Sequence, residues 1–76
     1  MVLHTLHSVA AITGDLAKGL TGSLGCLASA LSIAMIGTKA VESVGRNPGA
    51  AGRILVQSIL GMALAEAIAF YALFLS

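Results

Sequence analysis

Two long runs with almost no charge constrain this chain more than any other feature. Residues 19–38 contain no charged side chain and lie between Lys18 and Lys39. Residues 54–75 contain a single charged side chain, Glu66. As helices with a rise of about 1.5 Å per residue, the runs would span about 30 and 33 Å, close to the thickness of a bilayer core. Because a helix satisfies its own backbone hydrogen bonds in lipid, the pattern predicts two membrane-spanning helices.

The composition supports this class and excludes others. The chain has 76 residues, 58% hydrophobic and 9% charged, whereas soluble proteins average about 25% charged. The net charge of +1 gives no reason to expect a nucleic-acid partner. The single cysteine, Cys26, excludes an internal disulfide and a thiol-rich metal site, and we interpret it as a small apolar packing residue. We therefore expect an all-α membrane protein without a bound metal.

The segment between the two runs predicts a tight turn. Residues 39–53 carry three of the four basic residues and the only proline. Pro48 has no amide donor and disfavours helical geometry at Asn47, the residue before it. The chain is therefore expected to form a single two-helix transmembrane hairpin over residues 1–76, with a first helix at about 16–43, a polar loop at about 44–50 and a second helix at about 51–75.

The segment before the first run is mildly apolar and contains His4 and His7. Residues 1–15 could extend the first helix, but we expect a surface-lying or frayed segment. A metal site at the two histidines is a much weaker interpretation. A secretory signal peptide has a shorter apolar region directly after a basic start, whereas this run is of full length and begins only after Lys18, so we set that interpretation aside.

The charges of the loop predict the orientation of the hairpin. Lys39, Arg46 and Arg53 outnumber the one acid of the loop, Glu42. The N-terminal flank carries one acid and one base, which cancel. The positive-inside rule then places the loop on the cytoplasmic side and both termini on the opposite side of the membrane.

The first run has a bulky face and a small face when it is drawn as a helix. The bulky residues fall within an arc of about 80° and are Leu20, Leu24, Leu27, Leu31 and Met35. The opposite side is mostly small and carries Gly22, Gly25, Cys26, Ser29 and Ser32, although Ile33 and Ile36 also lie there. Small faces allow membrane helices to pack closely, and a small helix beside a bulky one forms a wedge. Identical wedges can close into a homo-oligomeric ring, although two helices could also pack only with each other.

The acid in the second run is the candidate functional group. Glu66 lies about 18 Å along its helix from residue 54, near the bilayer midplane. An ionised carboxylate there costs about 2.5–3.5 kcal/mol on insertion scales, and desolvation favours the neutral acid. A group with a tolerated neutral form and a costly charged form is suited to carrying a proton. The structural alternative is a neutral acid that joins the helices through a hydrogen bond to Ser29 or Ser32.

Two segments carry a family resemblance. GTKAVESVGRNPGA contains Arg46, Asn47 and Pro48, and LGMALAEAIAFYALF places its acid twenty residues after that arginine. Together they resemble the proteolipid, or ring-forming c-type chain, of rotary F-type ATP synthases over nearly the whole chain. The resemblance implies a ring of identical hairpins with the first helices inside, and an ion-carrying role for Glu66.

The resemblance also implies partners and a location. Arg46, Asn47 and Pro48 match the loop that contacts the gamma and epsilon subunits of the central stalk. Glu66 would exchange its proton at the a subunit of the stator, and membrane lipids would surround the ring. The location would be an energy-transducing membrane, in the first place a bacterial inner membrane.

The sequence departs from the family pattern on the first helix. The family has glycine at alternate positions, where this chain has small but larger residues: Cys26, Ala28, Ala30, Ser32 and Ala34. With Gly22, Gly25 and Ser29, these residues are our candidates for ring packing. Their greater size indicates that helix spacing and ring size differ from those of glycine-rich members.

The surroundings of the acid predict a proton as the transported ion. Sodium-using members supply a glutamine and a serine where this chain has Ile33 and Ala67, so the site lacks oxygen ligands. Tyr71 matches a family tyrosine that can hydrogen-bond the carboxyl, and Leu64 is a further candidate for support of the proton site. No bound cofactor is expected.

Other functions remain open on these residues. One alternative is a small oligomeric cation channel or hairpin transporter, in which Glu66 would line a pore or bind a cation. Another is a purely structural proteolipid. The chain lacks a nucleotide-binding loop of the GxxxxGK[ST] kind and a nucleophile–base set, so we expect a non-catalytic component of an enzyme complex.

Overall fold

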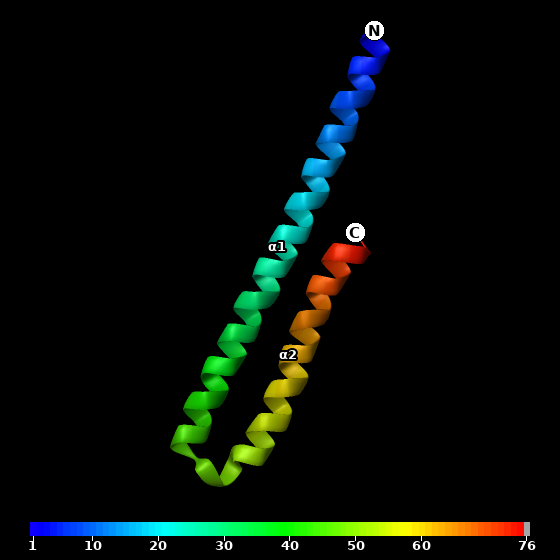
Figure 1. Ribbon diagram of the computed structural model, residues 1–76. Helices are drawn as coiled ribbons and strands as arrows, with labels where there is room; N and C mark the ends of the chain where they lie inside the picture. Colours follow the sequence, from blue (N-terminus) through cyan, green and yellow to red (C-terminus); the bar gives the residue numbers. More distant parts are fainter. Residues whose placement is uncertain (76) are drawn as a thin grey trace.

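The chain forms a helical hairpin in the computed structural model, which describes residues 1–75 (Figure 1). Helix α1 comprises Val2–Arg46, the short 3-10 helix η1 comprises Pro48–Ala50, and helix α2 comprises Ala51–Phe74. The two long helices lie side by side and run in opposite directions (Figure 1). Both are long and apolar enough to cross a membrane. The predicted all-α hairpin is confirmed.

The turn forms at the Asn-Pro-Gly sequence. Asn47 leaves the helical region with φ −141° and ψ 75°, and its N–H still donates to the carbonyl of Ser43 at 2.9 Å. Pro48 begins η1, where its missing amide hydrogen is not needed. The N–H of Ala50 then donates to the carbonyl of Asn47 at 3.0 Å. The reversal therefore needs no left-handed residue, and positive φ angles are absent from the described chain.

The helix boundaries differ from the predicted ones mainly at the N-terminus. Helix α1 begins at Val2 and not near residue 16, so residues 2–15 are helical and not frayed. No proline interrupts this segment, and the hydroxyls of Thr5 and Thr13 donate to the carbonyls four residues earlier. A lone glycine, Gly14, costs a helix only about 1 kcal/mol. At the other end α1 extends to Arg46, and the loop is shorter than predicted.

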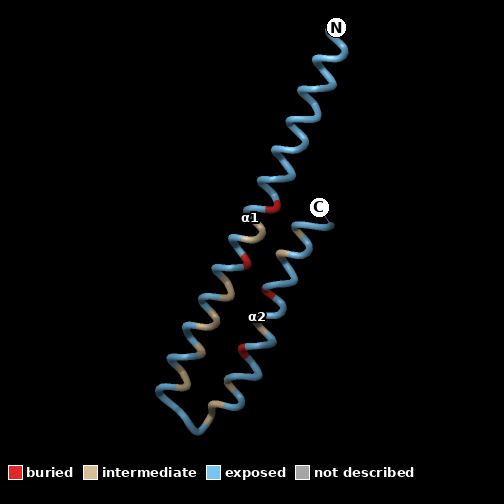
Figure 2. Tube along the Cα trace, in the orientation of Figure 1, coloured by how far each residue is buried: buried red, intermediate tan, exposed pale blue. Residues whose placement is uncertain are grey.

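Small residues form the contact between the two helices. The buried positions are Gly22, Ser29, Ser58 and Ala65, and all lie on the sides that face the opposite helix (Figure 2). Gly25 approaches Ala72 so closely that a Cβ on the glycine would collide with the Cβ of the alanine. The contact therefore depends on close backbone approach at Gly25, and elsewhere a glycine faces a large side chain, as Gly61 faces Ile36.

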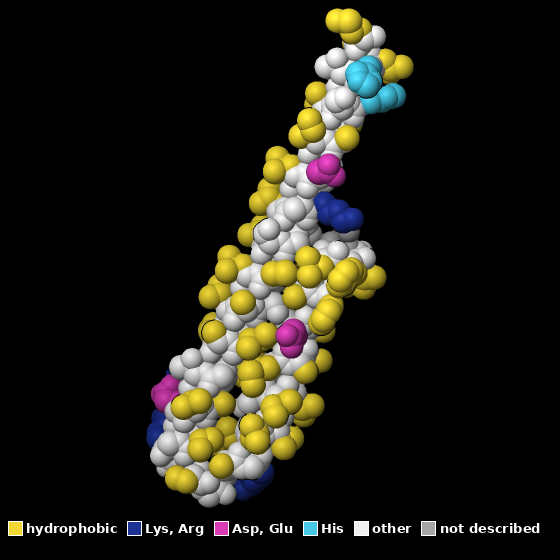
Figure 3. All heavy atoms as spheres, viewed as in Figure 1, with side chains coloured by type: hydrophobic (Ala, Val, Ile, Leu, Met, Phe, Trp, Pro, Cys, Tyr) yellow, Lys and Arg dark blue, Asp and Glu magenta, His cyan; other side chains and the backbone are white. Residues whose placement is uncertain are grey.

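Most of the large apolar side chains are exposed in the single hairpin. Leu24, Leu31, Leu64 and Phe74 are each more than half exposed, and no large side chain is fully buried in the described chain. Hydrophobic side chains are spread along the visible face of both helices (Figure 3). Such a surface needs an apolar environment, either lipid or further protein.

Helix α1 extends beyond the end of α2. A Cβ on Gly22 would meet Leu73, close to the C-terminal end of α2. The N-terminal part of α1 therefore continues past the end of α2 as a single helix (Figure 1).

Candidate functional site

Glu66 lies on α2, directly after the buried Ala65. On the opposite helix, Ser29 lies beside this part of α2, because its Oγ donates a hydrogen bond to the carbonyl oxygen of Ala65 at 2.8 Å. Glu66 is itself exposed and is the only acidic residue of α2. Figure 3 shows one acidic side chain surrounded by hydrophobic atoms part-way along α2. The carboxyl therefore projects from an otherwise apolar surface.

The two serines considered as partners of the carboxyl have other acceptors. Ser29 donates to Ala65, and Ser32 donates to the carbonyl of Ala28, four residues earlier in its own helix, at 2.9 Å. Glu66 has no hydrogen-bond or ion-pair partner within residues 1–75. Within one hairpin, neither Ser29 nor Ser32 is therefore bonded to the acid, and a hydrogen bond from Glu66 to a serine stays an alternative.

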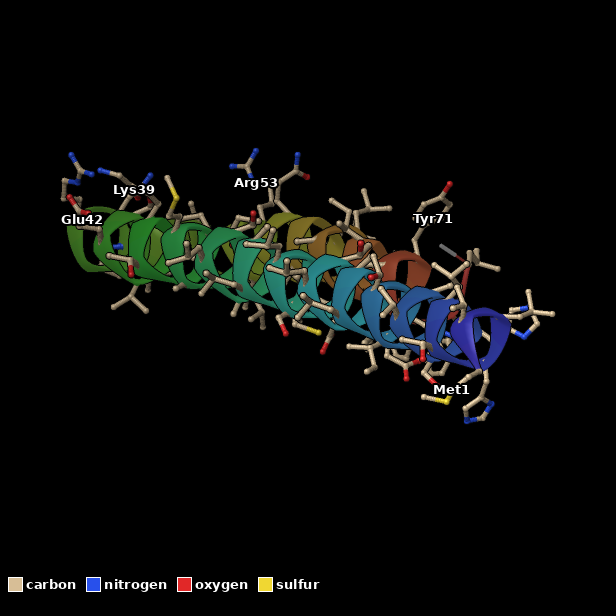
Figure 4. The ribbon with its side chains drawn as sticks, turned by 90° about the horizontal axis from the view of Figure 1, so that it is seen from above. Met1, Lys39, Glu42, Arg53 and Tyr71 are labelled. Carbon is tan, nitrogen blue, oxygen red and sulfur yellow. The ribbon has the colours of Figure 1, made fainter. Side chains whose placement is uncertain are left out.

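Tyr71 and Glu66 lie on different sides of α2. Five residues at 3.6 residues per turn correspond to a rotation of about 140° around the helix axis. Tyr71 is 62% exposed, and Figure 4 shows its side chain projecting away from the hairpin. Within residues 1–75, no hydrogen bond joins Tyr71 to Glu66. The predicted hydrogen bond from Tyr71 to the carboxyl therefore stays a prediction.

The other predicted support residues do not converge on the carboxyl. Leu64 is 72% exposed and Ala67 is exposed, whereas Ile33 is partly buried on α1. Ile36 on α1 is level with Gly61 on α2, and Ser29 is level with Ala65. Ile33 lies between those two α1 levels and so sits nearer the turn than Glu66. None of the three side chains carries an oxygen atom, so none can coordinate sodium.

The small residues of α1 divide into two groups. Gly22, Gly25, Cys26, Ser29 and Ser32 are buried or partly buried in the isolated hairpin. Ala28, Ala30 and Ala34 are exposed. The first group thus includes the residues in contact with α2, and only the second is left fully accessible for contacts between hairpins.

The turn end of the hairpin carries four of the seven charged residues, which are Lys39, Glu42, Arg46 and Arg53. Glu42 forms ion pairs with Lys39 at 3.5 Å and with Arg46 at 3.4 Å. Figure 4 shows Lys39 and Glu42 at the same end of α1, with Arg53 on the other helix. Arg46, Asn47 and Pro48 are all exposed. The turn is therefore a polar, exposed end of the hairpin. Its predicted contact with another protein stays a prediction.

A comparison with known protein families identifies the family of this hairpin. Residues 16–76 match the family of ATP synthase C subunits. The chain belongs to this family. The match includes the turn, Glu66 and the paired part of the hairpin, but it does not include residues 1–15. Residues 2–15 of α1 thus lie outside the part that this chain shares with the family.

Curated relatives carry the name of the ATP synthase c-type chain. The protein from Geotalea uraniireducens is 43% identical over 58 residues, which cover 76% of this chain and 64% of the relative. The protein from Dehalococcoides mccartyi strain BAV1 is 41% identical over 61 residues, which cover 80% of each chain. The chain thus spans slightly less than two thirds of the Geotalea protein. No solved structure matches this chain.

Proposed function

We propose that this chain is the proton-carrying rotor subunit of an F-type ATP synthase. The observation that supports the proposal is a lone carboxyl, Glu66, on the exposed apolar face of a membrane-spanning helix, with no partner in its own hairpin over residues 1–75. An unpartnered acid at this depth has two useful states. The neutral acid tolerates lipid, and the ionised form requires water or a cation.

The neutral and ionised forms of Glu66 would couple rotation of the ring to the binding and release of a proton. The loaded Glu66 is carried through the lipid-facing part of the rotation, and the ionised Glu66 is stabilised at the a subunit of the stator, where protons enter and leave. The membrane potential supplies about 2.3 kcal/mol per elementary charge per 100 mV. Each copy of the chain passes one proton per turn, so the number of copies sets the ratio of protons to rotation.

A proton fits the site better than sodium. Sodium needs several oxygen ligands to replace its water, whereas a proton needs one base. Ile33 and Ala67 supply no oxygen. The transported ion is therefore H⁺, and no bound cofactor takes part.

A ring of identical hairpins would cover the surfaces that one hairpin leaves exposed. The accessible Ala28, Ala30 and Ala34 allow close contact between neighbouring first helices. The remaining large apolar side chains would face membrane lipids. The chain provides rotation and not catalysis, and ATP is made elsewhere in the complex.

The exposed turn is proposed to transmit the rotation. Arg46, Asn47 and Pro48 would contact the gamma and epsilon subunits of the central stalk. This contact places the loop on the cytoplasmic side of an energy-transducing membrane, in the first place the bacterial inner membrane, with both termini on the opposite side. The excess of basic residues at the turn supports that orientation.

Labelling with a hydrophobic carbodiimide tests the proposal, because this reagent reacts with protonated carboxyls in an apolar environment. In membranes that contain the assembled complex, we expect labelling of Glu66 and not of Glu42, which is ion-paired at the polar turn. Labelling should fall as pH rises, and sodium should give no protection. Strong protection by sodium would refute the proton assignment.

The matched variant is Glu66→Gln, which keeps the size of the side chain but cannot ionise. We expect assembled complex without proton-driven ATP synthesis. Glu42→Gln is the control and should retain synthesis. Full ATP synthesis by Glu66→Gln would refute the rotor role, and proton conduction by the purified chain alone would favour the channel alternative.

A further inference from the structure

Ser29 differs from the other helical hydroxyls of the hairpin in where it donates its hydrogen bond. Thr5, Thr13, Thr21, Ser32 and Ser58 each donate to the carbonyl four residues earlier in the same helix. This local bond is the usual arrangement for serine and threonine inside helices. Ser29 instead donates across to the carbonyl of Ala65 on α2 at 2.8 Å. This side-chain hydrogen bond joins the two helices.

The acceptor of this bond is the peptide group that leads into Glu66. The carbonyl of Ala65 and the amide of Glu66 belong to the same planar peptide unit. Both bonded residues are buried, with Ser29 3% exposed and Ala65 7% exposed. The bond therefore holds α2 at one rotation about its axis at the level of the carboxyl. Because successive helix residues are separated by about 100°, Glu66 is then directed to the flank of the contact with α1.

The rest of the interface cannot fix this rotation equally well. The close contact of Gly25 with Ala72 lies about 10 Å along α2 from Ala65, and on the other side Ile36 packs against the bare backbone of Gly61. These contacts fix how closely the helices approach, but they are apolar and do not favour one direction as a hydrogen bond does. A hydrogen bond is directional, and water is not available inside a membrane to replace it. We propose that Ser29 is a positioning residue that sets the direction in which Glu66 presents its carboxyl to the membrane and to the stator. This inference rests on the proton-carrying role of Glu66 proposed above.

Ser29→Ala is the decisive variant, and Ser58→Ala is its matched control. Ser58 is also buried, at 9% exposure, but its Oγ donates to Ile54 in its own helix at 2.6 Å. Each variant removes one buried hydroxyl oxygen. Only Ser29→Ala removes a bond between the helices, so a general effect of hydroxyl loss would appear in both.

The experiment uses the assembled complex in membrane vesicles and two measurements on Glu66. One is the rate of carbodiimide labelling at a fixed pH. The other is the infrared carbonyl band of the protonated carboxyl, isolated by subtraction of the spectrum of Glu66→Gln. For Ser29→Ala we expect a broadened band and a labelling rate changed by at least about twofold, the lower end of what one hydrogen bond supports. Ser58→Ala should match the wild type in both.

Three results would overturn the positioning role. They are a wild-type band and rate in assembled Ser29→Ala, equal changes in the two variants, and failure of Ser29→Ala alone to assemble, which would show a purely structural role. Failure of the proposed function gives a different result, because labelling of the wild type would then show no dependence on pH and Glu66→Gln would retain ATP synthesis.

Discussion

The glycines of α1 allow a direct test of how closely the two helices approach. Gly25 and Gly19 lie in the same helix, less than two turns apart, and differ in their surroundings. A Cβ on Gly25 would collide with the side chain of Ala72, whereas a Cβ on Gly19 would meet no atom within 4 Å. We therefore compare Gly25→Ala with Gly19→Ala, since both variants add the same methyl group.

The expected difference in stability follows from packing alone. Replacing glycine by alanine inside a helix gains up to about 1 kcal/mol from helix propensity, and this gain is shared by the two variants. Only Gly25→Ala must separate the helices, because the colliding atom of Ala72 lies next to its backbone and cannot swing away. Inserting a methyl group into a packed contact costs about 1–3 kcal/mol. Gly25→Ala should thus unfold more easily than Gly19→Ala by about that amount.

The assay is SDS titration of the chain in detergent micelles, followed by energy transfer between probes on the two helices. This signal reports separation of the helices and not loss of helical structure, which SDS preserves. Gly22→Ala supplies an intermediate case, since its Cβ would lie 3.2 Å from Leu73 Cδ2, the end of a flexible side chain. Equal midpoints for Gly25→Ala and Gly19→Ala would refute the close approach of the helices at Gly25.

Two further predictions concern the ends of the hairpin and use the same titration. Glu42→Ala should change the free energy of unfolding by less than about 1 kcal/mol, and added salt should reduce the effect, because both ion pairs of Glu42 are exposed; a loss larger than that would show that the pairs hold the turn. Deletion of residues 2–15 should leave this free energy unchanged, since the N-terminal part of α1 continues past the end of α2 (Figure 1). A clear loss would show that these residues stabilise the hairpin.

Much of the fold could be predicted from local patterns. The apolar runs at residues 19–38 and 54–75 indicate two membrane helices because length and hydropathy act on each helix separately. The turn at Asn47 and Pro48 follows from backbone sterics of the two residues alone. The N-terminal extension was harder to predict, because its mild hydropathy fits both a frayed segment and the helix that the structure contains.

At the candidate site, the sequence predicted the acid but not the hydrogen-bond partners of the residues around it. Glu66 stands out in the sequence because any acid at mid-membrane is costly, whatever its neighbours. The sequence offered Ser29 and Ser32 equally as partners of the acid, and Tyr71 was expected near it by family resemblance. The structure directs Ser29 to the backbone of Ala65 and Ser32 to its own helix. These outcomes depend on the rotation and depth of one helix against the other, which the spacing of residues along one helix does not encode.

The sequence by itself therefore determined that this chain is a membrane hairpin with one acid in its second helix. Hydrophobicity, charge and proline sterics are properties of single segments, so they can be evaluated without a partner segment. The tertiary structure decided which small residues of α1 contact α2, which hydroxyl joins the helices and toward which side Glu66 projects. Those features arise from close packing of two backbones at Gly25 and from the bond between Ser29 and Ala65, and they exist only once the helices meet.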